Sequence, residues 1–141
     1  TFWTESIGPT AALKTLELMK KQKSWIKITK IGRQIIKNWE KIAKKNSIKI
    51  KIKGIPALCS FEFVSKNNDL YKNLITQEML KKGYLASNVI YVSTSHKMNI
   101  LKRYYKILND IFKVISKCEK GADIHIYLNN KVSQKKFSRL N

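Results

Sequence analysis

The longest regular pattern of apolar positions runs from residue 24 to residue 45. Its apolar side chains recur every three or four positions, the spacing that places them on one face of an α-helix. They are Trp25, Ile28, Ile31, Ile35, Trp39 and Ile42. The basic residues Lys27, Lys30, Arg33, Lys37, Lys41 and Lys44 lie mostly off this stripe. Ser24 has the side chain of a helix N-cap. We therefore predict a long amphipathic helix that begins after Ser24 and packs both tryptophans in the core.

Three further stretches predict helices. The first spans about residues 8–23 and opens with a Gly-Pro pair, which suits the first helical turn. The second runs from a cap at Asn68 or Asp69 to a stop at Gly83. The third is long and follows residues 93–95, whose hydroxyls offer several caps. Its apolar stripe consists of Leu101, Tyr104, Leu108, Ile111 and Ile115.

Two short stretches between these helices alternate between apolar and polar positions, which is typical of half-buried strands. The apolar members are Ile48, Ile50 and Ile52 in the first stretch, and Cys59, Phe61 and Phe63 in the second. The break at residues 54–56 is short, which favours antiparallel pairing. Residues 84–86 and 89–92 resemble further short strands. The pattern predicts an α+β fold, with an antiparallel sheet of three to four strands covered by long helices.

The charge of the chain is extreme. Its 141 residues include 29 basic and 9 acidic side chains, a formal net charge of +20. Such a balance suggests nucleic acid or an anionic surface as a partner. Only three of the basic residues are arginine, the residue that specific nucleic-acid sites prefer, and the lysines are dispersed. We therefore favour a solvated basic surface over a nucleic-acid site, and keep a basic binding module as the alternative.

The residues alone show no complete active site. His96 and His125 lack neighbours at metal-ligand spacing, so no metal site is predicted. Cys59 falls on an apolar strand face and, like Cys118, has no partner that would suggest a disulfide framework. No stretch is apolar enough to span a membrane, so no membrane partner is expected.

Several segments resemble one family. Residues 1–17, TFWTESIGPTAALKTLE, resemble the join between the large and small domains of class III pyridoxal-phosphate (PLP) aminotransferases. The similarity is greatest to the glutamate-1-semialdehyde aminomutase-like branch. Four later segments resemble the C-terminal domain of that family in the same order. They are residues 54–58 with the strand at 61–63, residues 76–87, the Ser-Thr-Ser-His turn at 93–96 and the Phe-Ser-Arg-Leu segment at 137–140.

This resemblance implies that residues 1–141 form the C-terminal small domain of such an enzyme, with residues 1–8 as the joining loop. The family binds PLP through a lysine and moves amino groups to or from an aldehyde or keto carbon. That lysine belongs to the large domain, so no catalytic residue is predicted here and the chain is expected to be inactive alone. The resemblance further implies a homodimer, a small amino-acid or amino-sugar-like substrate and a cytoplasmic location.

One site residue can be carried over. Thr1 matches the threonine that reaches across the family's dimer to the cofactor phosphate. The chain departs from the family pattern at two positions that bear on substrate binding. Close relatives tend to carry arginine where Ser6 stands and histidine where Gln134 stands. Arg139 could pair either with a substrate carboxylate or within a structural ion pair. A further alternative is a degenerate remnant of the enzyme without activity.

Overall fold

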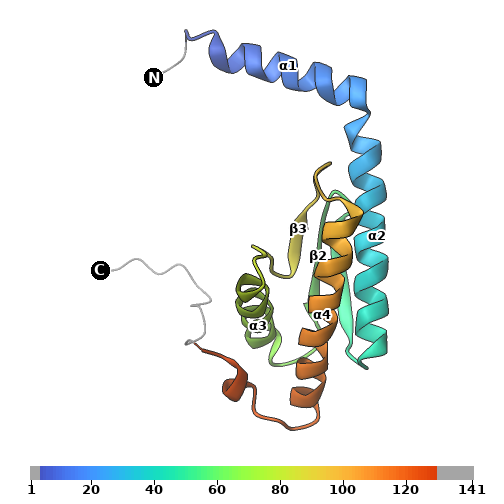
Figure 1. Cartoon of the computed structure of the whole chain (residues 1–141), viewed down its shortest axis with the longest axis vertical. Coiled ribbons are helices and arrows are strands. Elements are labelled where there is room, and N and C mark those ends of the chain that lie inside the picture. The colour runs from blue at the N-terminus through green and yellow to red at the C-terminus, as the bar shows by residue number, and fades with distance from the viewer. Residues whose placement is uncertain (1–3, 130–141) are drawn as a thin grey trace, which may run out of the picture.

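The computed structural model describes residues 4–129 (Figure 1). The described chain forms four α-helices, three strands and a short 3-10 helix, which confirms the predicted α+β fold. In order, they are α1 (Ile7–Gln22), α2 (Ser24–Lys45), β1 (Ile50–Ile55), β2 (Leu58–Phe63), α3 (Asn68–Lys81), β3 (Val89–Tyr91), α4 (Met98–Glu119) and η1 (Ile124–Tyr127).

The sheet has three antiparallel strands in the order β1-β2-β3. A two-residue turn, Pro56 and Ala57, joins β1 to β2, and Ile55 pairs with Leu58 across it. The prediction of a strand at residues 84–86 is wrong. Gly83 adopts a φ of 80°, and the backbone N–H of Tyr84 donates a hydrogen bond to the carbonyl oxygen of Met79. These residues therefore end α3, as Gly83 was predicted to do, and do not extend the sheet.

The core lies between the sheet and helices α2, α3 and α4 (Figure 1). Cys59, Phe61 and Phe63 on β2 are buried, as their alternation predicts. The Phe61 ring makes an edge contact with Trp39 of α2 at 4.8 Å between centroids. All five residues of the predicted α4 stripe are also buried. Each large apolar side chain buried in this way contributes about 1.5–3 kcal/mol, so this interface dominates the stability of the fold.

The start of α2 differs from the prediction in two ways. Lys23, with a left-handed φ of 49°, occupies the cap position, and Ser24 is the first helical residue with its hydroxyl buried and unpaired. The prediction that Ser24 caps the helix is therefore wrong. Trp25 is 48% exposed, so its predicted place in the core is also wrong. The first turn of α2 extends beyond the end of the sheet (Figure 1).

Two other predicted caps are also wrong. Asn67 holds the cap position of α3, because the Asn68 side chain instead accepts a hydrogen bond from the Phe63 amide at 2.9 Å. Helix α4 begins at Met98 with Lys97 at its cap position and no side-chain cap bond. The hydroxyl residues before it form a separate turn. None of the helices in the described chain is long and apolar enough to cross a membrane.

Candidate functional site

The residue predicted to contact the cofactor, Thr1, lies outside the described residues, as do Gln134 and Arg139. The predicted contact between Thr1 and a cofactor phosphate therefore remains a prediction. Ser6 lies at the cap position of α1 and makes no side-chain cap bond. Ser6 lines none of the hollows described below.

The cysteines and histidines are not arranged for metal binding in the part of the chain that the structure describes. Cys59 and Cys118 are both buried and unpaired, and burial raises the pKa of both thiols. A buried neutral thiol acts as a small core residue, and Cys59 lies on the apolar strand face that its sequence position predicts. His125 is exposed on η1, where its backbone amide donates to the Asp123 carboxylate.

Of the two histidines, His96 is the one whose imidazole ring has hydrogen-bond partners. Its Nδ1 accepts the backbone N–H of Ser93 at 2.8 Å and lies 3.3 Å from the Ser93 hydroxyl. Because Nδ1 is the acceptor, the neutral ring carries its proton on Nε2. The ring lines a hollow of about 300 Å³ with Tyr84, Tyr91 and Tyr104. This serine and histidine lack a carboxylate to orient the ring within residues 4–129, so the pair lacks the third member of a nucleophilic triad.

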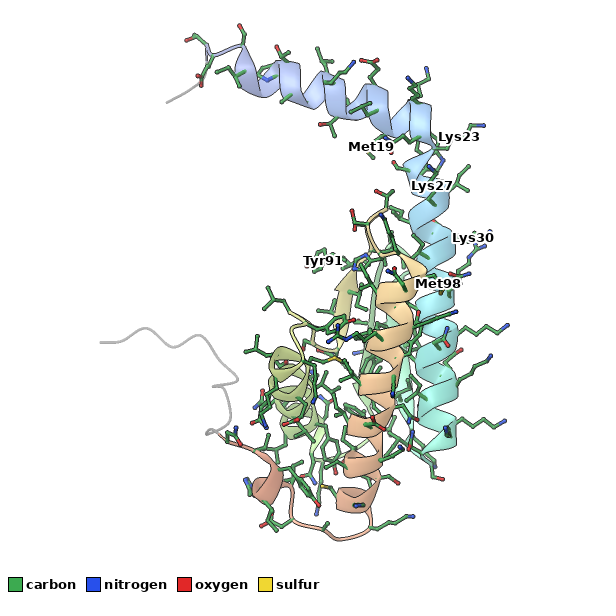
Figure 2. The ribbon with its side chains drawn as sticks, in the orientation of Figure 1. Met19, Lys23, Lys27, Lys30, Tyr91 and Met98 are labelled. Atoms are coloured by element: carbon green, nitrogen blue, oxygen red, sulfur yellow. The ribbon has the colours of Figure 1, made fainter. Side chains whose placement is uncertain are left out.

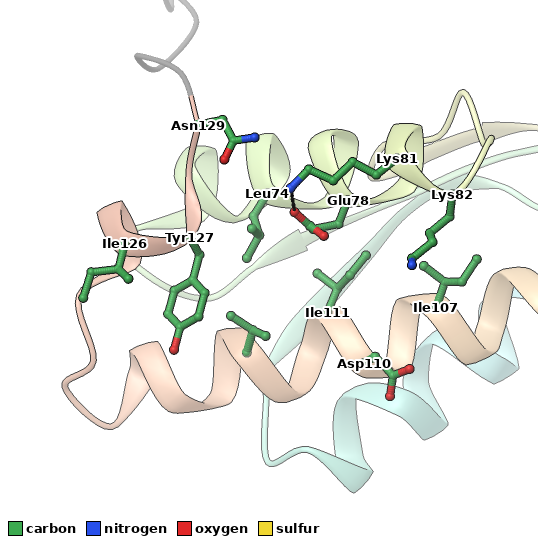
Figure 3. A pocket seen from close by; sticks show the side chains of 11 residues that line it. Leu74, Glu78, Lys81, Lys82, Ile107, Asp110, Ile111, Ile126, Tyr127 and Asn129 are labelled. Carbon is green, nitrogen blue, oxygen red and sulfur yellow. Dashed lines mark hydrogen bonds and ion pairs between the residues drawn. The ribbon is translucent and has the colours of Figure 1, made fainter.

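A hollow of about 410 Å³ lies between α3, α4 and η1 (Figure 3). Leu74, Ile107 and Ile111 form apolar walls, and charged side chains surround the opening. The Gln77 side chain fixes the η1 end against α3, because its amide donates to the Tyr127 carbonyl at 2.9 Å. Its oxygen accepts the Asn129 amide at 2.8 Å.

Both carboxylates at this opening are paired with lysines. Glu78 accepts hydrogen bonds from Lys81 at 2.6 Å and from Gln77 at 2.8 Å. Burial acts to raise the pKa of Glu78, but these two bonds outweigh it and the pKa is lowered. The hydrogen bond from Lys113 likewise lowers the pKa of Asp110. Both carboxylates are therefore ionised at neutral pH, and the lysine beside each one balances its charge. The hollow is suited to binding rather than to proton transfer.

The described lysines do not fit a complete PLP site. A lysine that forms a Schiff base needs a partly desolvated amine facing an enclosed pocket. All lysines within residues 4–129 are exposed except Lys72, which is partly buried and lies 3.6 Å from the Asp69 carboxylate. Lys82 lines the α3–α4 hollow, but its side chain is exposed to solvent. No step of PLP chemistry can be assigned to these residues.

Helix α1 is the least covered part of the described chain. None of its 16 residues is buried, and Leu13 and Leu16 are 69% and 62% exposed. The helix turns away from the body at Lys23 and contacts the end of α2, with no other element against its sides (Figures 1 and 2). A row of exposed apolar side chains of this kind is typical of a surface that another protein segment covers.

Comparison with known proteins gives one structural relationship. No protein-family model and no curated protein matches the sequence. The chain is similar in structure to the FumI protein of Sphingopyxis sp. MTA144, solved in its PLP internal aldimine form. The TM-score is 0.68 over 82% of this chain, at 14% sequence identity.

At this identity the likeness is one of fold. This chain has the fold of one part of a PLP-dependent enzyme. It spans 28% of the length of the FumI chain, so most of that enzyme has no counterpart among these residues.

Neither the α3–α4 hollow nor the exposed side of α1 could be predicted from the sequence. The α3–α4 hollow brings together charged residues that resemble ordinary solvated helix faces in the sequence. The helix predicted at about residues 8–23 forms as α1, but nothing in its local sequence shows that it leaves the body. Lys23 turns the helix by adopting a left-handed backbone conformation. Lysine rarely adopts this conformation, so its presence in the sequence does not predict a turn.

Proposed function

We propose that this chain is the C-terminal small domain of a PLP-dependent aminotransferase or aminomutase. The family would be class III, in the glutamate-1-semialdehyde aminomutase-like branch, with residues 1–8 as the joining loop. The observation that supports the proposal most strongly is the shared fold with a PLP-bound enzyme over 82% of this chain. The ordered motifs in the sequence support the same family independently. The alternative of a basic nucleic-acid module is supported by net charge alone.

The complete enzyme would transfer an amino group to or from an aldehyde or keto carbon of a small amino-acid or amino-sugar-like substrate. Since the described lysines are exposed, apart from Lys72 beside the Asp69 carboxylate, the PLP-binding lysine would come from the large domain, and these residues alone would be inactive. Thr1 would contact the cofactor phosphate of the opposite subunit in a cytoplasmic homodimer.

The PLP-binding domain would cover the apolar side of α1. Leu13 and Leu16 lie one turn apart on this helix and are both exposed. Covering two such side chains would contribute about 1.5–3 kcal/mol each to the association. A helix that is poorly covered here would then be a buried connection in the complete protein.

The test begins with the coding sequence that precedes Thr1. If the proposal is correct, the same frame or a neighbouring one encodes a PLP-binding domain with a candidate lysine. The complete protein, or the two polypeptides expressed together, should then show the visible absorbance of lysine-bound PLP and convert an amino donor into its keto product. Substituting the candidate lysine should abolish both signals.

The 141-residue chain alone is the matched control. Mixed with PLP and reduced with borohydride, it should show only scattered, weak labelling of exposed lysines in a peptide map. Saturable labelling of a single lysine within these residues would contradict the proposal. So would a complete protein or co-expressed pair that binds no PLP.

A further inference from the structure

Helix α2 has a row of cations on the side opposite its buried stripe. Successive members are three or four residues apart and therefore share one face of the helix. They are Lys30, Arg33, Lys37, Lys41 and Lys44, and all five are exposed. At 1.5 Å per residue the row is about 21 Å long. Figure 2 shows Lys30, the first of them, on the outer side of α2.

These cations are not neutralised within the fold. The ion pairs of the described residues lie on other elements, and none involves a basic side chain of α2. Glu40 is the one acidic residue of α2, and it also lies on this face. Helices α3 and α4 differ, because Lys81 and Lys113 each have a carboxylate three residues earlier within 3 Å. The face of α2 therefore carries a net positive field that an acidic partner could neutralise.

An apolar anchor point lies at one end of the row. Trp25 and Ile26 are 48% and 55% exposed, and they line an open groove of about 660 Å³ together with Lys30, Arg33 and Lys37. The Trp25 ring offers a large apolar surface beside the cations, and exposed tryptophan and arginine are the residues that most often dominate protein interfaces.

We propose that this face of α2 docks an acidic protein segment that inserts one apolar side chain beside Trp25. Its carboxylates pair with Lys30, Arg33 and Lys37, and the apolar side chain fills the groove at Trp25 and Ile26. Nucleic acid fits this face less well. The row has a single arginine and one exposed aromatic ring, whereas single-stranded nucleic acid is held by several stacked bases along its backbone.

The test measures binding of a labelled synthetic peptide to the full chain by fluorescence anisotropy. The peptide carries glutamates and a single leucine on the same side of a helix, because the cations and Trp25 line one groove. We expect saturable binding that weakens with salt and falls ~10-fold or more in the triple variant Lys30→Gln/Arg33→Gln/Lys37→Gln, since three cations are lost. Trp25→Ala should also weaken binding, whereas raising salt should affect that variant as it affects the wild type.

A second triple variant is the control for net charge. Lys102→Gln/Lys106→Gln/Lys117→Gln removes the same charge from exposed positions of α4, and should leave the affinity within about twofold because these sites are away from the groove. Thermal unfolding must show that both triple variants remain folded.

Three results would overturn the proposal: no saturable binding of the peptide, equal losses in the two triple variants, or binding of oligo(dT) or phosphatidylserine vesicles that is tighter than peptide binding and depends on the same residues. The binding reaction needs neither PLP nor a large domain, so its failure is distinct from failure of the proposed enzyme function.

Discussion

Gly32 on α2 lies so close to Pro56, in the turn between β1 and β2, that a Cβ atom at position 32 would overlap the Pro56 carbonyl oxygen. The contact is between two backbones, so no side chain can move to relieve it. Gly32 is also buried in the middle of a long helix, where glycine is normally unfavourable by about 1 kcal/mol relative to alanine. The close approach of the hairpin explains why glycine occupies this position.

Gly32→Ala should therefore destabilise the fold even though alanine is the better helix former. Inserting a methyl group against fixed backbone forces α2 and the hairpin apart, which we expect to lower the free energy of unfolding by ~3 kcal/mol. Urea unfolding followed by circular dichroism measures the change. Gly8→Ala is the matched control, because a Cβ at position 8 meets nothing within 4 Å. Equal stability of the two variants would contradict the observed approach.

A buried hydrogen bond joins α2 to α4 and gives a second prediction. The indole N–H of Trp39 donates to the Tyr104 hydroxyl at 3.0 Å, and both side chains are at most 3% exposed. Tyr104→Phe should lower the free energy of unfolding by about 1–3 kcal/mol, because it leaves the indole donor buried without an acceptor. Trp39→Phe should lower it further, because it also leaves a cavity.

The double variant Trp39→Phe/Tyr104→Phe isolates this bond. If the bond is formed, the loss in the double variant is smaller than the sum of the two single losses by ~1 kcal/mol, since no donor or acceptor is left unpaired. Additive losses would show that the two side chains do not interact. The measurement is again urea unfolding at neutral pH.

Regular patterns in the sequence predicted the elements that pack on the sheet. The five stripe residues of α4 and the three alternating residues of β2 are all buried, because helical and strand periodicity fix which side of an element faces the core. The same rule failed at Trp25. Its spacing continues the buried stripe of α2, but this turn of the helix lies beyond the end of the sheet. Periodicity gives the direction of a side chain and not whether anything lies opposite it.

Features that depend on distant contacts could not be predicted. Gly32 resembles a weak point in a helix until the β1–β2 turn is placed against it. Ser24 is a favourable cap residue, but the chain turns one residue earlier, at Lys23, and the hydroxyl is buried instead. The α3–α4 hollow likewise needs η1, which Gln77 holds against α3 from about 50 positions away in the sequence.

The tyrosines of α4 predict a loss of stability at alkaline pH. Burial raises the pKa of Tyr104 well above its usual value and raises that of Tyr105 to about 12. In the unfolded chain both phenols lose their protons near pH ~10. The folded state therefore binds more protons above that pH. The stabilising contribution is complete below about pH 10 and is lost as the pH rises toward the folded values.

We expect the free energy of unfolding to fall between about pH 10 and pH 12, by at most ~1.4 kcal/mol per pH unit for each tyrosine. Tyr104→Phe should make this decline shallower while lowering stability at neutral pH. Tyr91→Phe, which removes a phenol that is 74% exposed, is the matched control. Unfolding by urea at a series of pH values measures the slopes. An unchanged slope in Tyr104→Phe would contradict the assignment to this buried phenol.

A variant on the exposed side of α1 can test folding and assembly separately. Leu13→Glu/Leu16→Glu changes two side chains that are 69% and 62% exposed, so the free energy of unfolding of the 141-residue chain should change by less than about 1 kcal/mol. Leu108→Ala, at a fully buried position of α4, should lower it by about 3 kcal/mol in the same experiment.

If the proposed PLP-binding domain covers α1, the double glutamate variant of the complete protein should fail to join that domain, because two charges would be buried against an apolar surface. Size-exclusion chromatography and the visible absorbance of bound PLP measure this loss. If the isolated chain is instead destabilised as strongly as Leu108→Ala destabilises it, then α1 packs on the body of this domain and the turn at Lys23 does not hold it away in solution.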